Sequence, residues 1–91
     1  MDIKNFAESP LPDNFCLSIL WYDANDQWDT AHELADSRSD ADSAWLHAYL
    51  HRKEGDKWNA RYWYNRAGRP FPNYSLEEEW EKLYIHFSDN K

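Results

Sequence analysis

The sequence predicts an all-α protein of about five helices, and three observations support this. Apolar residues recur at helical spacing, and no segment shows sustained strand alternation. The only two glycines, Gly55 and Gly68, stand where a left-handed residue would end a helix. Aromatic residues make up 18% of the 91 residues and can fill a small core. Residues 1–91 are therefore expected to form a single helical domain.

The first predicted hairpin covers residues 12–36. One helix spans roughly residues 12–24 after the SPLP turn, and a second spans roughly residues 27–36 before SRSD. Their inner faces are formed by Phe15, Ile19 and Tyr22 in the first helix and by Trp28, Ala31 and Ala35 in the second. Residues 1–11 are expected to form an N-terminal extended segment.

The second predicted hairpin covers residues 40–68. A helix over residues 40–54 begins at Ser39 or Asp40 and is apolar almost all round, which predicts a central position. Gly55 and Asp56 then form the turn into a helix over residues 57–67. The apolar positions of that helix are Ala60, Trp63, Tyr64 and Ala67.

A capping helix is predicted over residues 75–88. Ser75 and Glu78 form a capping box, and the acidic residues 77–79 suit the positive end of a helix dipole. Its inner stripe is formed by Leu76, Trp80, Leu83, Tyr84 and Phe87.

Charge and cysteine content exclude several classes of protein. A net charge of -7 argues against general nucleic-acid binding, although residues 52–69 carry a local +4. No apolar run approaches membrane-spanning length, and MDIKNFAESPLPD does not read as a secretion signal. Cys16 is a lone cysteine in an apolar run, expected to be a buried thiol. We therefore expect a soluble cytoplasmic protein.

The two hairpins are related in sequence. DQWDTAHELA at residues 26–35 resembles GDKWNARYWYNRA at residues 55–67, with Ala31 aligned to Ala60. The second hairpin resembles a tetratricopeptide or Sel1-like repeat, on the basis of Ala48, Gly55, Asp56, Ala60, Tyr64, Ala67 and Pro72. The resemblance implies two stacked helical hairpins with a terminal cap, and dimerisation would add to so small a stack. Residues 26–70 are also similar to a family of short bacterial proteins of unassigned function.

A first candidate site is an aromatic and basic surface for a peptide or protein partner. It is formed by Tyr49, Arg52, Trp58, Tyr62 and Arg66. Such a surface suits ring stacking and pairing with a carboxylate or phosphate. The alternative is that the last helix covers it, with Trp80 packing on the rings and residues 77–81 pairing with the arginines.

A second candidate is a metal site. His47 and His51 stand four residues apart on one helical face, and His32, on the stripe of a neighbouring helix, or Glu33 next to it would be the third ligand. Glu54 fits a carboxylate behind His51. The alternative is that these histidines are core residues bonded to protein groups. His86 is expected at the surface.

The sequence favours a non-enzymatic interaction module without a cofactor, binding a protein or peptide partner and perhaps forming a homodimer. A small metal-binding protein or metal-dependent enzyme is the alternative. Residues 48–50 lack the glutamate of the HExxH motif, and no glycine-rich phosphate loop is present.

Overall fold

The computed structural model describes residues 3–89 and contains six α-helices and no strand within them, which confirms the all-α prediction. The helices are α1 (Ile3–Ala7), α2 (Phe15–Ala24), α3 (Trp28–Asp36), α4 (Ala41–Glu54), α5 (Lys57–Ala67) and α6 (Leu76–Asp89). Their boundaries follow the predicted ones closely, except at the N-terminus.

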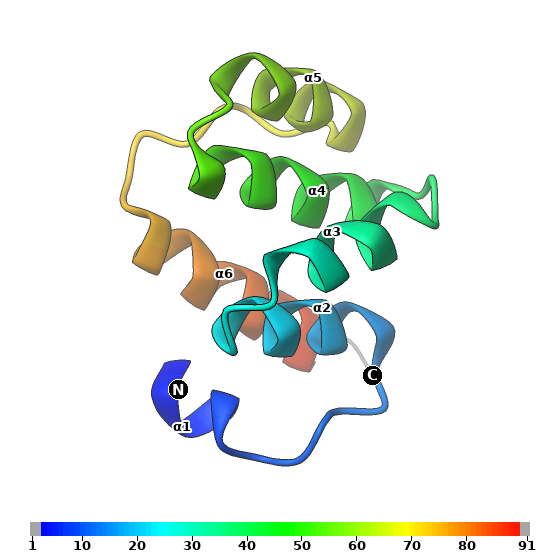
Figure 1. The fold of residues 1–91 in the computed structure, drawn as a ribbon. Coiled ribbons are helices and arrows are strands. Elements are labelled where there is room, and N and C mark those ends of the chain that lie inside the picture. Colours follow the sequence, from blue (N-terminus) through cyan, green and yellow to red (C-terminus); the bar gives the residue numbers. More distant parts are fainter. Residues whose placement is uncertain (1–2, 90–91) are drawn as a thin grey trace.

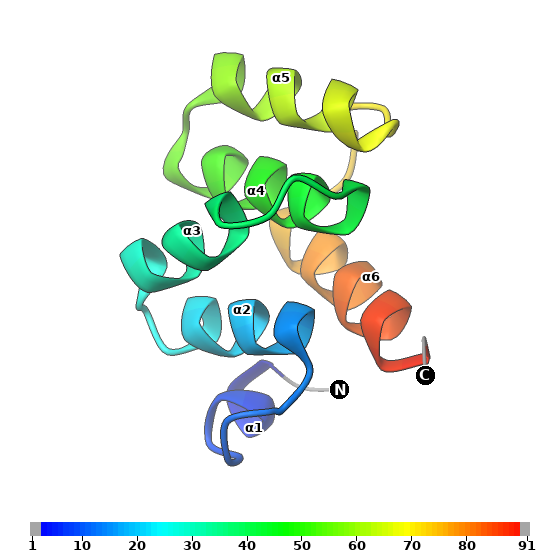
Figure 2. The same cartoon turned by 90° about the vertical axis from the view of Figure 1, so that its right-hand side faces the viewer.

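The helices form a stack in which α4 is central. The α2–α3 hairpin lies beneath the α4–α5 hairpin, α6 crosses both α2 and α4, and α1 closes the far end (Figure 1, Figure 2). Every residue from Ser43 to His51 in α4 is buried. The prediction that the helix over residues 40–54 is central is therefore confirmed.

Left-handed residues end the first helix of each hairpin. Gly55 (φ 91°) does so between α4 and α5, and Gly68 (φ 72°) ends α5 in the same way. In the α2–α3 hairpin this position is taken by Asp26 (φ 60°), and the next amide, of Gln27, donates to the Tyr22 carbonyl at 2.9 Å. Aspartate tolerates this conformation better than most residues. The side chains that cap helix N-termini include Asn14, Asp40 and Asp56.

The N-terminal segment differs from its prediction. Residues 1–11 were expected to be extended, but Ile3–Ala7 forms the short helix α1. Phe6 is buried there, with its ring 5.6 Å from that of Trp80 and 5.2 Å from that of Tyr84. A helix of five residues is too short to produce a periodic apolar pattern in the sequence. Helix α1 is stabilised instead by the packing of Phe6 on α6, which the sequence does not reveal.

A buried carboxylate joins α4, α5 and α6. Glu79 of α6 is 0% exposed and accepts hydrogen bonds from Arg52 Nη1 at 2.9 Å, Tyr64 Oη at 2.5 Å and Trp45 Nε1 at 3.1 Å. Arg52 also donates to the Tyr74 carbonyl. The burial of this charge is tolerated because it is paired with a guanidinium and satisfied by further donors.

A second buried carboxylate attaches α2 to α4. Asp23 is 2% exposed, and it accepts hydrogen bonds from Tyr49 Oη at 2.9 Å and from Lys53 Nζ at 2.8 Å. The Asp23 and Glu79 networks both draw on side chains of α4. Its register relative to α2, α5 and α6 is therefore fixed by directional bonds as well as by apolar packing.

Within residues 3–89, no helix combines the length and apolar character that a membrane crossing requires.

We expect Glu79→Gln to lower the free energy of unfolding by about 3 kcal/mol, because it leaves the largely buried Arg52 without its countercharge. Urea unfolding followed by circular dichroism measures this change. Glu78→Gln, an exposed neighbour on the same turn, should change stability by no more than about 0.5 kcal/mol. Equal stability of the two variants would show that the buried ion pair does not hold the helices together.

Candidate functional site

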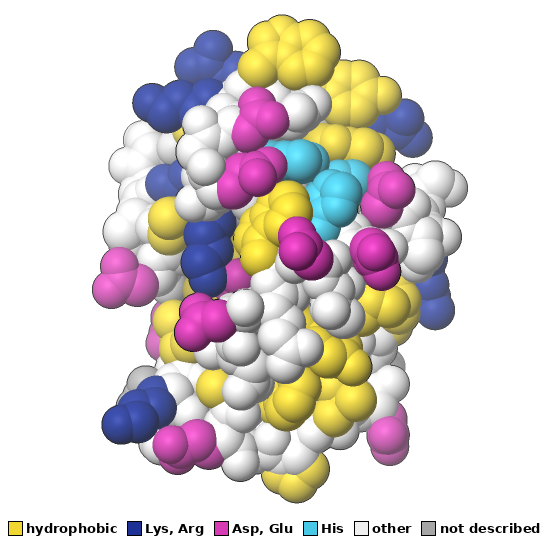
Figure 3. All heavy atoms as spheres, viewed as in Figure 1, with side chains coloured by type: hydrophobic (Ala, Val, Ile, Leu, Met, Phe, Trp, Pro, Cys, Tyr) yellow, Lys and Arg dark blue, Asp and Glu magenta, His cyan; other side chains and the backbone are white. Residues whose placement is uncertain are grey.

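Three histidines converge between α3 and α4. His32 belongs to α3, and His47 and His51 lie one turn apart on α4. One ring nitrogen from each lies within 4.8 Å of the others, and the Nε2 atoms of His32 and His47 are 3.0 Å apart. Although His47 is buried, histidine side chains are visible at the surface between a hydrophobic patch and several carboxylates (Figure 3). The structure thus brings together the three residues of the metal-site prediction, which we call the histidine cluster.

Tryptophan rings hold the histidine cluster in place. Trp28 stacks on His32 at 4.8 Å between ring centroids, and its Nε1 donates to the Leu50 carbonyl at 2.9 Å, which fixes α3 against α4. Trp63 of α5 stacks on His47 at 3.9 Å. The sequence placed both tryptophans on apolar stripes, but it did not identify them as walls of a site. Their packing limits the rotation of two of the imidazoles.

Carboxylates stand behind two of the imidazoles. His51 Nδ1 lies 2.7 Å from Glu54 Oε2, the contact that the sequence predicted for this glutamate. His47 Nδ1 is buried without a hydrogen-bond partner, and Asp36 Oδ1 lies 4.0 Å from it. The sequence did not indicate Asp36, which stands four positions after His32, because nothing in the sequence relates it to His47. A carboxylate behind a histidine orients the ring and increases the basicity of its other nitrogen.

Burial keeps His47 neutral. It is 2% exposed, and its pKa falls from 6.5 to about 4, first because of burial and then because of the positive charge that His32 and His51 carry when protonated. The nearby Asp36 opposes this shift. A neutral imidazole retains a lone pair at neutral pH.

The spacing of the donors suits a small cation. In a tetrahedral zinc site with Zn–N bonds of 2.0–2.1 Å, the ligand nitrogens are roughly 3.3 Å apart. The 3.0 Å between the Nε2 atoms of His32 and His47 is close to that edge, and small rotations would bring in the third nitrogen. No fourth protein ligand atom joins this group within the described part of the chain.

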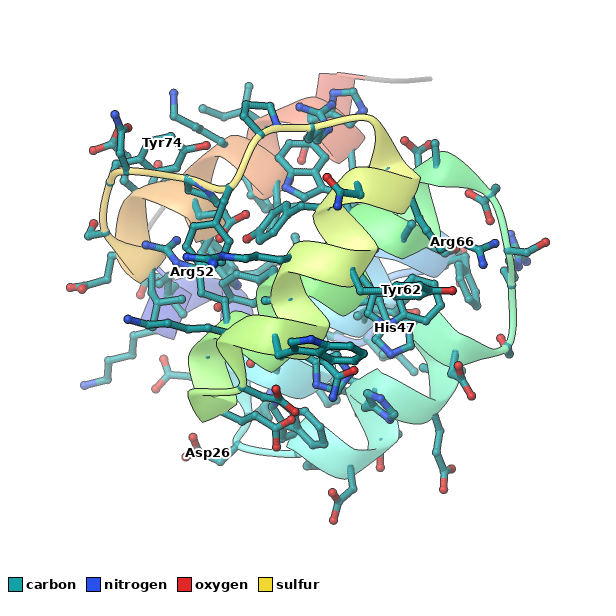
Figure 4. All side chains as sticks on the ribbon, turned by 90° about the horizontal axis from the view of Figure 1, so that it is seen from above. Asp26, His47, Arg52, Tyr62, Arg66 and Tyr74 are labelled. Carbon is teal, nitrogen blue, oxygen red and sulfur yellow. The ribbon has the colours of Figure 1, made fainter. Side chains whose placement is uncertain are left out.

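The predicted partner surface is divided by the structure. Trp58 is 76% exposed and Tyr62 46% exposed, and Arg66 Nη1 donates to Tyr62 Oη at 3.2 Å. Tyr49 and Arg52 do not belong to this surface, because the Asp23 and Glu79 carboxylates draw them inside. Arg52 lies across α5 from Tyr62 and Arg66 (Figure 4).

The alternative of a covering last helix holds only in part. Glu79 of α6 pairs with Arg52, as that alternative required. However, the packing of α6 is on α2 and α4, and it meets α5 through the Tyr64–Glu79 hydrogen bond rather than over Trp58 and Tyr62. Trp58 and Tyr62 therefore stay exposed.

Cys16 and His86, the other candidate reactive side chains, are packed against protein groups. Cys16 packs against the core, and burial, followed by the charges of Asp42 and Asp40, raises its pKa to about 11, so the thiol stays protonated. His86 is half-buried rather than fully at the surface, since it lies 3.6 Å from Asp42 and its ring packs on Trp45.

A cavity of about 260 Å³ lies beneath the segment that joins α5 to α6. It is lined by Trp45, Tyr64, Arg69, Pro70, Phe71, Pro72, Asn73, Tyr74 and Glu79. The Glu79 oxygens already accept three hydrogen bonds from protein side chains. The histidine cluster is the better-defined candidate site. Its nitrogens converge, and they are not occupied by several protein hydrogen bonds as the Glu79 oxygens are.

Comparison of the chain with protein-family models, curated proteins and solved structures gives no match. The resemblance of the second hairpin to tetratricopeptide and Sel1-like repeats stays a prediction from its residues.

The pKa of His47 predicts how stability depends on pH. Because His47 titrates near pH 6.5 when unfolded and near pH 4 when folded, the unfolded chain binds more protons between these values. Stability should therefore fall as the pH decreases from 6.5 towards 4. In metal-free buffer, we expect His47→Gln to reduce this loss by about 1–3 kcal/mol, since each pKa unit corresponds to about 1.4 kcal/mol.

Urea unfolding at several pH values measures this effect, with His86→Gln as the control histidine variant. The cause assigned to the pKa shift would be refuted if His47→Gln and wild type lost the same stability over this range.

Proposed function

We propose that the protein binds a divalent transition-metal ion, preferentially Zn²⁺, through His32, His47 and His51. The observation that carries this proposal is the convergence of three imidazole nitrogens within 4.8 Å from two packed helices. Imidazole nitrogens are common ligands of zinc, copper and nickel. Calcium and magnesium prefer oxygen ligands, so a site built from nitrogen atoms favours the transition metals.

The hydrogen-bond pattern supports the same proposal. The Nδ1–H of His51 donates to Glu54, which leaves the lone pair of Nε2 on that ring available to an ion. If His32 and His47 direct Nε2 at an ion, the proton of His47 must be on Nδ1, where Asp36 stands 4.0 Å away. A small movement of this exposed carboxylate would satisfy the buried nitrogen. Without an ion, one of the facing Nε2 atoms must donate to the other, and His47 Nδ1 has no partner.

The number of ligands bears on the kind of site. Structural zinc sites usually have four protein ligands, whereas sites that bind an exchangeable water or substrate usually have three. The histidine cluster offers three within the described residues. We infer that a water molecule or another external ligand takes the remaining coordination position.

Metal binding has more structural support than the partner-binding function that the sequence favoured. Two of the five residues of the predicted partner surface, Tyr49 and Arg52, are bonded to buried carboxylates. All three histidines of the predicted metal site lie together, and Glu54 lies behind one of them as expected. The geometry therefore favours the metal-binding alternative.

Protein purified without an affinity tag should bind about one equivalent of Zn²⁺. Co²⁺, which has visible absorption, should give the spectrum of a low-symmetry nitrogen site. Because each histidine supplies a bond to the ion, His32→Ala, His47→Ala or His51→Ala should lower the affinity by more than about 100-fold, while His86→Ala should leave it unchanged. Calorimetry and Co²⁺ titration measure both. Weak zinc binding that is indifferent to all three variants would overturn the proposal.

Glu54→Gln tests the role of the carboxylate behind His51. Because Glu54 orients this ligand without contacting the ion, its loss should lower Zn²⁺ affinity by about 10- to 100-fold and leave the stoichiometry at one. Glu33→Gln removes the same charge from an exposed residue next to His32 in sequence and serves as the control. If both variants weakened binding equally, the effect would be general electrostatics and Glu54 would have no orienting role.

A further inference from the structure

The cavity beneath the segment that joins α5 to α6 is large enough for a small organic ligand. Trp45 of α4, Tyr64 of α5 and Glu79 of α6 contribute to its walls, and residues 69–74 of the joining segment, yellow in Figure 1, supply the rest. Its volume of about 260 Å³ exceeds the roughly 150 Å³ of an apolar cavity that holds benzene. Pockets for drug-sized ligands begin at roughly 300 Å³. The cavity therefore has room for one aromatic ring with a short side arm.

Aromatic rings line most of the cavity. They belong to Trp45, Tyr64, Phe71 and Tyr74, and two prolines of the joining segment add further apolar surface. The Phe71 ring meets the Tyr64 ring edge-on at 5.3 Å between centroids. The indole of Trp45 is fixed by its hydrogen bond to Glu79. Rings held in this way form a preorganised wall for a planar apolar group.

Arg69 brings an unpaired charge to this apolar cavity. Glu79 and Arg69 are the charged residues among those that line it, and the charge of Glu79 is already paired with Arg52 at 2.9 Å. Arg69 is half-buried, and its Cζ lies 3.4 Å from the centroid of the Trp45 ring. Within residues 3–89, no protein group forms a hydrogen bond or an ion pair with its guanidinium. Its N–H donors are therefore available to a ligand.

The backbone and the indole both hold Arg69 in position. Its amide donates to the Tyr64 carbonyl at 3.0 Å, directly after the left-handed residue Gly68. A guanidinium that stacks its face on an aromatic ring keeps its N–H groups in the plane of the stack, where a planar acceptor can pair with two of them. Because both the start and the end of this side chain are fixed, little rotational freedom is lost when a ligand binds.

The charges around the cavity favour an anionic ligand over a cationic one. Arginines already lie over two of its rings, since Arg69 covers Trp45 and Arg61 Cζ is 5.4 Å from the centroid of Phe71. A cationic ligand would therefore meet like charges at the ring faces. A carboxylate carries one negative charge, which one unpaired arginine neutralises, whereas a phosphate monoester would bring a second charge without a partner.

We propose that this cavity binds a small aromatic carboxylate, whose ring packs between the aromatic walls and whose carboxylate pairs with the Arg69 guanidinium. None of the three residues of the histidine cluster lines the cavity. The site is therefore independent of metal binding, and either of the two can fail in experiments without affecting the other.

Phenylacetate, a single ring with a short carboxylate arm, is the probe, and the metal-free full chain labelled with ¹⁵N is the sample. We expect a Kd of about 1 mM or lower. Nuclear magnetic resonance should show shifts of the Trp45 indole N–H and of the amides within residues 69–74. The indole signals of Trp28 and Trp63, beside the histidines, should not move. Signals that stay unchanged at about 10 mM phenylacetate, ten times that Kd, would overturn the proposal.

Two related compounds test the two halves of the ligand. Acetate lacks the ring, and 2-phenylethylamine has the ring with a cation in place of the anion. Both should bind at least about tenfold more weakly than phenylacetate, because each loses one of the two interactions. Equal binding of acetate would show a general anion effect without a ring pocket. Equal binding of the amine would contradict the role assigned to Arg69.

Variants of Arg69 identify the residue that pairs with the carboxylate. Arg69→Gln should weaken phenylacetate binding by about tenfold or more, because it removes the charged donor. Arg69→Lys keeps the charge without the planar fork, so its affinity should lie between those of wild type and Arg69→Gln. Arg66→Gln is the matched control, since Arg66 lies across α5 from Tyr74 (Figure 4) and should not affect binding.

Circular dichroism and thermal unfolding verify that each variant is folded. Arg69→Lys is the second test if the loss of stacking on Trp45 unfolds Arg69→Gln. His32→Ala, which removes a predicted metal ligand, should bind phenylacetate as wild type does. Folded variants of Arg69 that bind phenylacetate as tightly as wild type would contradict the proposal.

Discussion

The carboxylate of Glu79 constrains how three helices meet. A charged group with no solvent contact is stable only where protein donors replace water, and here the donors come from α4 and α5 while the carboxylate comes from α6. The requirement is directional, since Arg52, Tyr64 and Trp45 reach the two oxygens only in one relative register. Apolar packing alone would tolerate small slides of these helices, whereas this network does not.

The histidine cluster depends on that register. The arginine that neutralises Glu79 immediately follows His51 in α4, so the carboxylate positions the same turn that carries a predicted ligand. Tyr64 follows Trp63, and its bond to Glu79 fixes the part of α5 that stacks Trp63 on His47. Lys53, two residues after His51, is held by Asp23 of α2. Rigid helices anchored by buried ion pairs are a suitable support for a site that needs precise geometry.

Much of the fold was predictable because the relevant signals are local. Helix ends at Gly55 and Gly68, the central position of α4 and the pairing of His51 with Glu54 depend on residues close in sequence. The partners of Arg52 and Tyr49 were not predictable, because bonds to Glu79 and Asp23 span 27 and 26 residues and leave no periodic signature. Arginine is mostly exposed in proteins and tyrosine is intermediate, so neither residue type by itself predicts full burial. The turn at Asp26 was missed as a left-handed position for a related reason, since aspartate is a weaker signal there than glycine.

The stacking of tryptophan on histidine gives the protein an optical property. Indole emission is quenched by contact with a protonated imidazole and by nearby copper or cobalt ions, and Trp28 and Trp63 are in ring contact with His32 and His47. Their fluorescence should therefore differ from that of exposed Trp58 and report the protonation or occupancy of the cluster. The same rings would shield the site from bulk water and respond to anything that enters it.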